Sequence, residues 1–124
     1  QIAAIEKKQQ PPVLRVGNLS ARRDFTDVRD IVRAYTLILE KGTPGEVYNI
    51  GSGVSYPMSE ILHKLIALSS VPITVETESE RFMPVDIPDN RCDASKLKAQ
   101  TGWSQEITIE QSLRDVLDYW RNIA

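Results

Sequence analysis

Apolar side chains recur at intervals of three and four positions in three segments, which predicts three amphipathic helices that face a core. These segments are residues 27–42, about 57–68, and 108 to the C-terminal end. The side chains expected to point inward are Val28, Ile31, Val32, Tyr35, Ile38 and Leu39 in the first helix, Ile61, Leu62, Leu65 and Ile66 in the second, and Ile109, Leu113, Val116, Leu117 and Trp120 in the third.

Residues that cap or stop helices agree with this pattern. Thr26 or Asp27 can cap the first helix through a side-chain oxygen, and Gly42 can end it. A shorter helix is predicted within residues 93–103, where Gly102 is the expected stop. About four helices are therefore expected.

Short apolar runs bounded by proline, glycine and polar residues predict strands between the helices. They lie at residues 12–19, 23–26, 46–50 and 71–77, whereas the proline-rich segment 81–91 is expected to be a loop. Strands that alternate with helices predict an α/β fold.

The composition is ordinary for a soluble globular domain. The 124 residues suit one small domain, with 41% hydrophobic and 26% charged residues. The net charge of −2 gives no electrostatic reason to expect a nucleic acid or a membrane surface as partner, and no apolar run has the length of a transmembrane helix. The single cysteine cannot form an internal disulfide, which favours a reducing compartment such as the cytoplasm.

The chain begins without an initiator methionine, on residues that are typical of the end of a helix. Ile2 and Ile5 are the apolar positions there, and Pro11 and Pro12 stop the Lys- and Gln-rich stretch that follows. This start suggests a piece of a longer chain.

The sequence does not contain a complete set of catalytic or metal-binding side chains. Gly51-Ser52-Gly53 is only a fragment of the dinucleotide-binding fingerprint, so a plain turn is favoured over a phosphate-binding loop. His63 is the only histidine and has no partner for a metal or a nucleophile, so a structural or surface role is favoured. Cys92 precedes a predicted helix whose dipole can lower the pKa of a thiol, but a small packing residue is favoured. No catalytic and no metal-binding residue is assigned.

Arginines gather where a predicted strand leads into the first long helix, in the stretch RRDFTDVRDIV of residues 22–32. Such side chains are either solvated salt-bridge partners or the donors of an anion site. Asp30 fits the first helical turn, where the dipole favours a carboxylate. Arg22, Arg29 and Arg33 are interpreted as a solvated charged face.

Five segments, in this order and spacing, resemble the C-terminal part of a known family: RVGNLSARRDFTDVRDIVRAY, GEVYNIGSG, RFMPVDIP, DASKLKAQTGW and SLRDVLDYWR. Together they resemble the extended short-chain dehydrogenase/reductases that act on nucleotide-sugars, over nearly all residues from about 11 to 123. The resemblance implies that residues 1–124 form the small substrate-binding lobe. It also implies that the family's N-terminal Rossmann domain, with its cofactor loop and Ser/Thr-Tyr-Lys catalytic set, is not in this chain.

The resemblance places Arg23 on the diphosphate of the nucleotide-sugar, because this residue matches the arginine of the family's R-D-F/Y motif. A guanidinium suits the role, since its planar fork of donors pairs with phosphate oxygens at two points. A surface salt bridge is the alternative. Asp24 is expected to orient Arg23 or its neighbour.

The loop RFMPVDIP matches a family segment that usually reads Arg-x-Arg-Pro-x-Asp. By this match, Asp86 corresponds to the acidic residue that accepts hydrogen bonds from the ribose hydroxyls. The second arginine of the pattern is Met83 here, and methionine cannot donate to a phosphate. Either Arg81 reaches the diphosphate instead, or one contact is missing and Arg81 is a loop arginine in solvent.

Leu14 and Val16 match positions that line the nucleobase pocket in related enzymes, and simple core packing is an equally good interpretation. Asn18 either turns the chain after Gly17 or contacts the nucleotide, and a plain turn is favoured. Both tryptophans are expected in the core: Trp103 and Trp120.

The resemblance implies part of an NAD(P)-dependent enzyme, most similar to the reductases of GDP-4-keto-6-deoxymannose. The expected ligand is a GDP-linked sugar. The missing domain is expected to bind the cofactor, NADP or NAD, and the full-length enzyme is expected to be a homodimer. A GDP-mannose 4,6-dehydratase or a nucleotide-sugar epimerase is the alternative among enzymes. A truncated or stand-alone non-catalytic binding module is the alternative from another class, and either way the chain alone is expected to be inactive.

Overall fold

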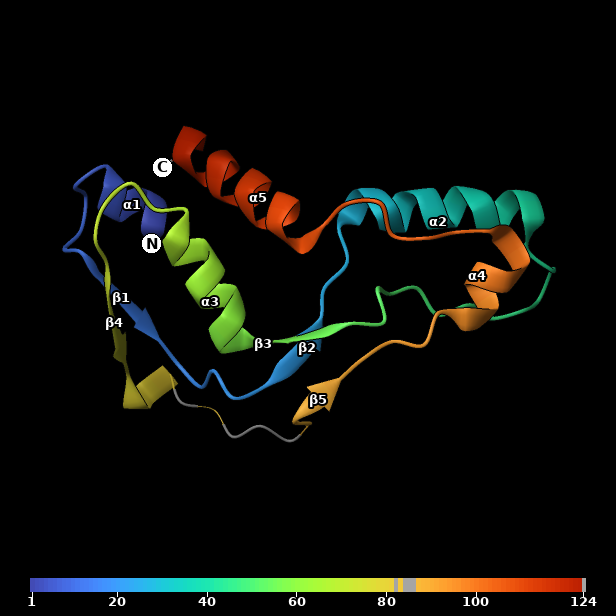
Figure 1. The fold of residues 1–124 in the computed structure, drawn as a ribbon, viewed down its shortest axis with the longest axis horizontal. Coiled ribbons are helices and arrows are strands. Elements are labelled where there is room, and N and C mark those ends of the chain that lie inside the picture. Colours follow the sequence, from blue (N-terminus) through green and yellow to red (C-terminus); the bar gives the residue numbers. More distant parts are fainter. Residues whose placement is uncertain (82, 84–86, 124) are drawn as a thin grey trace. The chain divides into compact units, whose positions relative to one another are not determined.

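The computed structural model describes residues 1–81, 83 and 87–123, and over this part of the chain it contains five α-helices and short strands (Figure 1). The α/β class is confirmed. The helix beyond the four expected ones is α1 (Ile2–Glu6), at the N-terminal residues that are predicted to be the end of a helix. Within the described residues, no helix combines the length and the apolar character that crossing a membrane requires. The elements are α1 (Ile2–Glu6), β1 (Val13–Val16), β2 (Arg22–Asp24), α2 (Val28–Lys41), β3 (Ser55–Pro57), α3 (Met58–Ala67), β4 (Thr74–Thr77), the short 3₁₀ helix η1 (Ser79–Arg81), β5 (Asp89–Asn90), α4 (Ser95–Thr101) and α5 (Ile109–Ile123).

The chain divides into two compact units, each assembled from separate stretches of sequence. The first unit combines residues 1–21, 57–88 and 110–124, and the second combines residues 22–56 and 89–109. Side chains that are far apart in the sequence therefore meet inside each unit.

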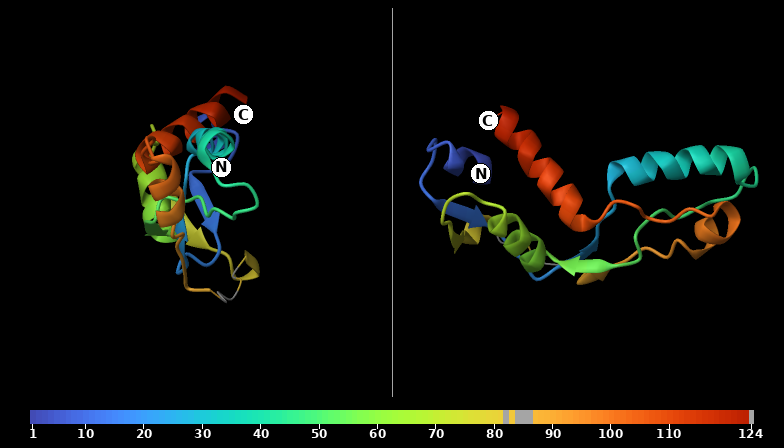
Figure 2. Two further views of the ribbon diagram at one scale, coloured as in Figure 1. Left: turned by 90° about the vertical axis from the view of Figure 1, so that its right-hand side faces the viewer. Right: turned by 45° about the horizontal axis from the view of Figure 1, so that its top comes forward.

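The first unit contains a two-stranded parallel sheet, in which β1 lies beside β4 (Figures 1 and 2). The register aligns Val13 with Thr74 and Val16 with Thr77, so the carboxyl ends of the two strands meet. Helices α1, α3 and α5 contribute the rest of its apolar core, which consists of Ile2, Leu14, Leu62 and Leu117.

An ion pair joins α1 to α5 inside the first unit. Arg121 donates from Nε and Nη2 to the two carboxylate oxygens of Glu6, each at 2.7 Å, and from Nη2 to the carbonyl of Leu68 at 2.8 Å. The backbone N–H of Ser70 also donates to Glu6 at 2.8 Å. These hydrogen bonds, with those from Arg121 first, lower the pKa of Glu6 from 4.5 to about 2.

The second unit packs α2 against α4 and contains a small sheet with the strand order β3–β2–β5. Strands β2 and β5 run parallel, and the register places Arg23 opposite Asn90. Helix α4 ends at Gly102, as predicted. The core of this unit consists of Ala34, Ala94, Leu97 and Trp103, so the core position predicted for Trp103 is confirmed.

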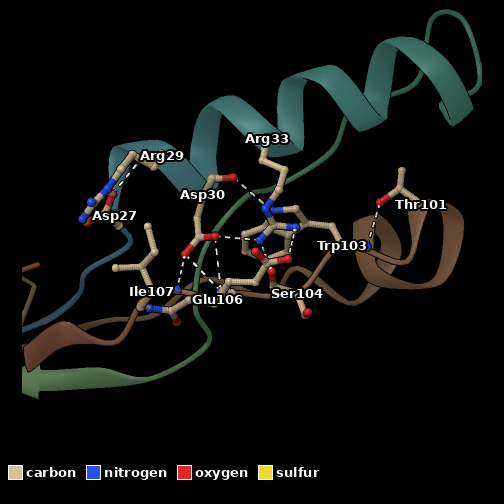
Figure 3. A network of polar contacts seen from close by, with 10 residues as sticks. Asp27, Arg29, Asp30, Arg33, Thr101, Trp103, Ser104, Glu106 and Ile107 are labelled. Atoms are coloured by element: carbon tan, nitrogen blue, oxygen red, sulfur yellow. Dashed lines mark hydrogen bonds and ion pairs between the residues drawn. The ribbon is translucent and has the colours of Figure 1, made fainter. Parts of the chain in front are cut away.

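A buried carboxylate fixes α2 to the segment that precedes α5 (Figure 3). Asp30 is 1% exposed and accepts hydrogen bonds from the backbone N–H groups of Glu106 and Ile107 at 3.1 and 3.0 Å. Arg33 donates to the same carboxylate at 2.6 Å, and the Trp103 indole donates to the Asp30 carbonyl at 3.0 Å. The sequence places Asp30 in a first helical turn, but it does not reveal these distant partners.

The strand predicted over residues 46–50 is wrong, because this segment forms no strand and β3 forms further along the chain. The alternation that suggested a strand still has a physical cause. Tyr48 and Ile50 pack against the core of the second unit, whereas Val47 and Asn49 are exposed. An extended segment can therefore alternate inward and outward side chains without pairing in a sheet.

The bounds of the first amphipathic helix are confirmed, and Asp27 caps it by accepting a hydrogen bond from the backbone N–H of Arg29 at 2.9 Å. The predicted inward face is largely wrong. Helix α2 packs through Ala34, Leu37 and Ile38. Four of the residues predicted to be inside are more than half exposed, and we call them the α2 stripe: Val28, Val32, Tyr35 and Leu39.

Helix α5 also buries only part of its predicted inward face. Ile109 and Leu117 are buried, but Val116 and Trp120 are exposed. The core position predicted for Trp120 is therefore wrong: the side chain is 54% exposed, and its ring meets that of Tyr119 edge-on, with 5.8 Å between the ring centroids.

Candidate functional site

Arg23 lies on β2 and lines a hollow of about 300 Å³ in the second unit. Pairing between β2 and β5 fixes its backbone beside Asn90. The guanidinium donates from Nη1 to the carbonyl of Arg22 at 2.7 Å. Arg23 as a residue is half-buried, and a guanidinium at a concave surface suits an anionic ligand. The other lining residues are Asp24, Thr26, Ile31, Ile50, Gly51, Asn90 and Cys92.

The other arginines of the strand-to-helix junction also have partners inside the protein. Arg22 donates from Nη2 to the carbonyl of Ser55 at 2.6 Å. Arg29 pairs with Asp27 at 2.8 Å, and Arg33 belongs to the buried network of Figure 3. The interpretation as a solvated charged face agrees with Arg22 and Arg29, whose side chains are about half exposed. It is wrong for Arg33, which bonds to the buried carboxylate of Asp30 and holds α2 to the segment before α5.

Asp24 follows Arg23 on β2 and accepts hydrogen bonds from two other segments. Ser52 donates from its backbone N–H at 3.1 Å and from its hydroxyl at 2.5 Å, and the N–H groups of Gly53 and Cys92 donate at 2.9 and 3.1 Å. Burial by itself raises the pKa of Asp24, but the hydrogen bonds from Ser52, Cys92 and Gly53 outweigh it and lower the pKa below its ordinary value.

The Gly51–Gly53 turn packs against this carboxylate. A Cβ atom at Gly51 would lie 2.3 Å from Cβ and 2.8 Å from Sγ of Cys92, so only glycine fits there. The N–H groups of Ser52 and Gly53 bind Asp24, which agrees with a structural turn rather than a phosphate-binding loop.

Cys92 is a half-buried wall of the hollow. Burial, followed by the nearby charge of Asp24, raises the pKa of its thiol. The thiol is therefore less readily ionised than a free cysteine, and the interpretation as a packing residue agrees with the structure.

Four of the candidate site residues lie in the first unit. Leu14 lies inside β1, and the other three lie at or after the carboxyl ends of β1 and β4: Val16, Asn18 and Arg81. Leu14 belongs to the core and Val16 packs at its edge. Asn18 donates from Nδ2 to the carbonyl of Met83 at 3.0 Å and accepts at Oδ1 from the N–H of Ser20 at 2.9 Å. Gly17 and Arg81 also approach closely, since a Cβ atom at Gly17 would lie 2.2 Å from the Arg81 carbonyl oxygen. Ligands of open α/β sheets bind outside the carboxyl ends of strands, so this grouping suits a binding site.

The loop candidates are only partly described. Arg81 ends η1 and forms an ion pair with Glu78, which also lies 3.4 Å from Arg15. Met83 exposes most of its side chain. Asp86, the expected ribose contact, lies outside the described residues.

The described residues contain no group of three or more His, Cys, Asp or Glu side chains that could hold a metal ion. His63 is exposed on α3, which agrees with the surface role, one of the two roles predicted for it.

Sequence reasoning missed two polar residues that share the hollow with Arg23. The sequence pattern indicates only a helix-cap role for Thr26, and Asn90 lies in a segment expected to be a loop. The parallel pairing of β2 with β5 brings Asn90 to Arg23, and two-residue strands leave too weak a pattern to predict such a pairing.

Comparison with known proteins identifies relatives over most of the chain. The family described as GDP-mannose 4,6 dehydratase matches residues 1–116. A GDP-6-deoxy-D-mannose reductase of Pseudomonas aeruginosa is 34% identical over 122 residues, which are 98% of this chain and 40% of the relative. A dTDP-glucose 4,6-dehydratase of Haemophilus influenzae is 32% identical over 119 residues, which are 88% of this chain and 35% of the relative.

A solved structure has the same fold. The structure of RMD from Pseudomonas aeruginosa complexed with NADPH matches all of this chain and 41% of its own, with a TM-score of 0.93 and 33% identity. The chain thus spans about two fifths of the length of these relatives. Because the family match covers nearly the whole sequence, the chain belongs to the GDP-mannose 4,6 dehydratase family, among the extended short-chain dehydrogenase/reductases that act on nucleotide-sugars.

Proposed function

We propose that residues 1–124 are the nucleotide-sugar-binding lobe of an NAD(P)-dependent reductase of GDP-4-keto-6-deoxymannose. The observation that carries the proposal is the place of Arg23, at the hollow of the second unit, in a chain that is 34% identical to a GDP-6-deoxy-D-mannose reductase. The guanidinium offers two parallel donors to the oxygens of the diphosphate.

The family resemblance supports further contacts with the nucleotide-sugar. Val16 and Leu14 line the nucleobase pocket, Asn18 and Arg81 lie near the nucleotide, and Asp86 accepts from the ribose. Binding of the remote nucleotide holds the sugar in place for reaction, an effect that can contribute several kcal/mol to catalysis.

The chemistry of the proposed reaction is a hydride transfer from the nicotinamide to the C4 ketone of the sugar. This chain has only the Gly51-Ser52-Gly53 fragment of a dinucleotide fingerprint, and its N–H groups are bonded to Asp24. The residues of this turn therefore do not fit a phosphate of the cofactor. NADP or NAD and the catalytic residues are assigned to the part of the enzyme that this chain does not span.

The exposed α2 stripe supports the proposal that another part of the enzyme covers this face of the second unit. It consists of four exposed apolar side chains, of which Leu39 is the most exposed, at 88%. Contiguous exposed apolar side chains mark an interaction surface. The cofactor-binding part, about three fifths of the length of the relatives, is the proposed occupant, and the whole enzyme is proposed to be a cytoplasmic homodimer.

A 4,6-dehydratase of a nucleotide-sugar is the second candidate, with an epimerase beside it. It is favoured by the description of the matching family and by the 32% identity to a dTDP-glucose 4,6-dehydratase. The reductase, the dehydratase and the epimerase would all use the same substrate lobe. The part of the enzyme that the chain does not span therefore decides which reaction takes place. Assays of the whole enzyme with GDP-mannose and with its 4-keto-6-deoxy derivative separate these reactions.

The first test measures the binding of GDP to the purified chain by titration calorimetry. Arg23→Ala is expected to weaken binding about tenfold or more, because it removes a charge-assisted pair with the phosphates. Arg29→Ala is the matched control, since Arg29 pairs with Asp27 outside the hollow. Equal affinities of Arg23→Ala and the unchanged chain would remove Arg23 from the site.

The chain alone is expected to show no reductase turnover with NADPH and the keto sugar, since it contains no catalytic set. Reduction catalysed by the purified 124-residue chain would contradict the assignment of the chemistry to another part of the enzyme. Mixing the chain with the cofactor-binding part of a relative tests the alternative from another class. A non-catalytic module would bind GDP but would show no reductase activity in this mixture.

A further inference from the structure

The carboxylate of Asp24 connects the three segments that surround Arg23. Its Oδ1 accepts both hydrogen bonds from Ser52, at 3.1 and 2.5 Å, and its Oδ2 accepts from Gly53 at 2.9 Å and Cys92 at 3.1 Å. Strand β2, the turn after Ile50 and the segment after β5 are thereby held at one point. A neutral amide in place of the carboxylate has only one acceptor oxygen for these four donors.

The same three segments form the walls of the hollow. Asp24, Gly51 and Cys92 all line it together with Arg23. The contact of Gly51 with Cys92 leaves no space for a Cβ atom, so a small displacement of the turn changes the shape of the hollow.

We propose that Asp24, supported by the Ser52 hydroxyl, is a positioning residue that holds Arg23 in place for the diphosphate of the nucleotide-sugar. The inference rests on the proposed function. A long arginine side chain loses conformational entropy when it binds a phosphate. A strand and a hollow that are held rigidly restrict this side chain before the ligand arrives, so less entropy is lost on binding. The carboxylate of Asp24 accepts four hydrogen bonds, which partly neutralise its negative charge and so limit its repulsion of a phosphate in the same hollow.

A structural role without influence on Arg23 is the competing explanation, and the chain offers a matched control for it. Asp30 is a buried carboxylate in the same unit, and it also accepts backbone N–H groups from a distant segment. It does not line the hollow. Asp30→Asn is therefore expected to lower the melting temperature and leave Arg23 unaffected, whereas Asp24→Asn is expected to change both.

The direct test follows the Nε–Hε group of Arg23 by ¹⁵N relaxation in the ligand-free chain. The signal is assigned by its loss in Arg23→Lys. Asp24→Asn and the milder Ser52→Ala are expected to lower its order parameter, whereas Asp30→Asn is expected to leave it unchanged. Unchanged order in both Asp24→Asn and Ser52→Ala overturns the inference, and if Asp24→Asn fails to fold, Ser52→Ala decides alone.

The second test combines the variants in a double-mutant cycle on GDP affinity. Asp24→Asn is expected to weaken GDP binding about tenfold in the unchanged chain and to have little further effect in Arg23→Ala, because it acts through Arg23. Equal losses in both backgrounds indicate a merely structural role and overturn the inference.

The two tests separate this inference from the proposed function. If the unchanged chain does not bind GDP, the proposed function fails, and the order parameter of Arg23 still decides whether Asp24 positions it. If Arg23→Ala abolishes binding but Asp24→Asn changes neither affinity nor order, the proposed function stands and the inference is wrong.

Discussion

Lys8 illustrates how single residues of this chain depart from the local rules of the backbone. It follows α1 and its cap Lys7, and it adopts a left-handed conformation with φ of 58°. Helices often end with a residue in this region, and glycine is the usual choice because it has no Cβ atom. A lysine at this position stores strain that the rest of the first unit must offset.

Lys8→Gly is expected to raise the free energy of unfolding by roughly 0.5–1 kcal/mol, because it removes the strain of a left-handed side chain. Thermal or urea unfolding of the purified chain measures the change. Lys7→Gly is the control, since Lys7 has a φ of −82° and gains nothing from glycine. A gain of the same size in both variants would show that strain at Lys8 is not the cause.

At the scale of the elements, the two longest helices of the described residues, α2 and α5, each have a second apolar face that is exposed. Helix α2 packs on its unit through Ala34, Leu37 and Ile38 and leaves the α2 stripe exposed. Helix α5 buries Ile109 and Leu117 and exposes Val116 and Trp120. The exposed faces explain why periodicity predicted α2 and α5 correctly but placed several of their exposed residues inside. The inward face predicted for α3 is confirmed.

Leu39→Gln is expected to change the free energy of unfolding of the chain by less than about 0.5 kcal/mol, because Leu39 makes little contact in it. Ala34→Leu, at a fully buried position of the same helix, is expected to cost about 1–3 kcal/mol through overpacking. Urea denaturation of both variants gives the comparison. A cost for Leu39→Gln similar to that of Ala34→Leu would mean that the stripe is covered in the isolated chain.

At the scale of the whole molecule, each unit is stabilised by a paired carboxylate. Glu6 joins α1 to α5 in the first unit, and Asp30 joins α2 to the segment before α5 in the second. Burial raises the pKa of Asp30, but hydrogen bonds from Ile107, Arg33 and Glu106 outweigh it and lower the pKa. Both carboxylates therefore stabilise the fold only while they are ionised.

The stability of the chain is expected to fall between about pH 4.5 and pH 2. The pKa of Glu6 is lowered from 4.5 to about 2 on folding, so its contribution is complete above pH 4.5 and is lost as the pH falls through about 2. Glu6→Gln is expected to cost roughly 2 kcal/mol at pH 7 and to flatten this acid limb. Urea unfolding at several pH values measures both effects.

Glu110→Gln is the control for this prediction. Glu110 is more than half exposed and pairs with Lys64 at 2.7 Å, an interaction that solvent screens. Its removal is expected to change the stability only slightly at pH 7. An acid limb that is the same in Glu6→Gln and in the unchanged chain would contradict the role of Glu6.

The sequence by itself determined the α/β class, the bounds of α2 and the stop at Gly102, because each depends on local spacing or capping. The role of Arg23 follows from a family motif and stays a prediction. Only the tertiary structure decided which helix faces are buried, since an amphipathic pattern shows that a face is apolar but not what covers it. It also decided the partners of Asp30 and Asp24. These side chains bond to segments 28 to 77 residues away, and pairings over such separations depend on how the chain is folded rather than on any local pattern.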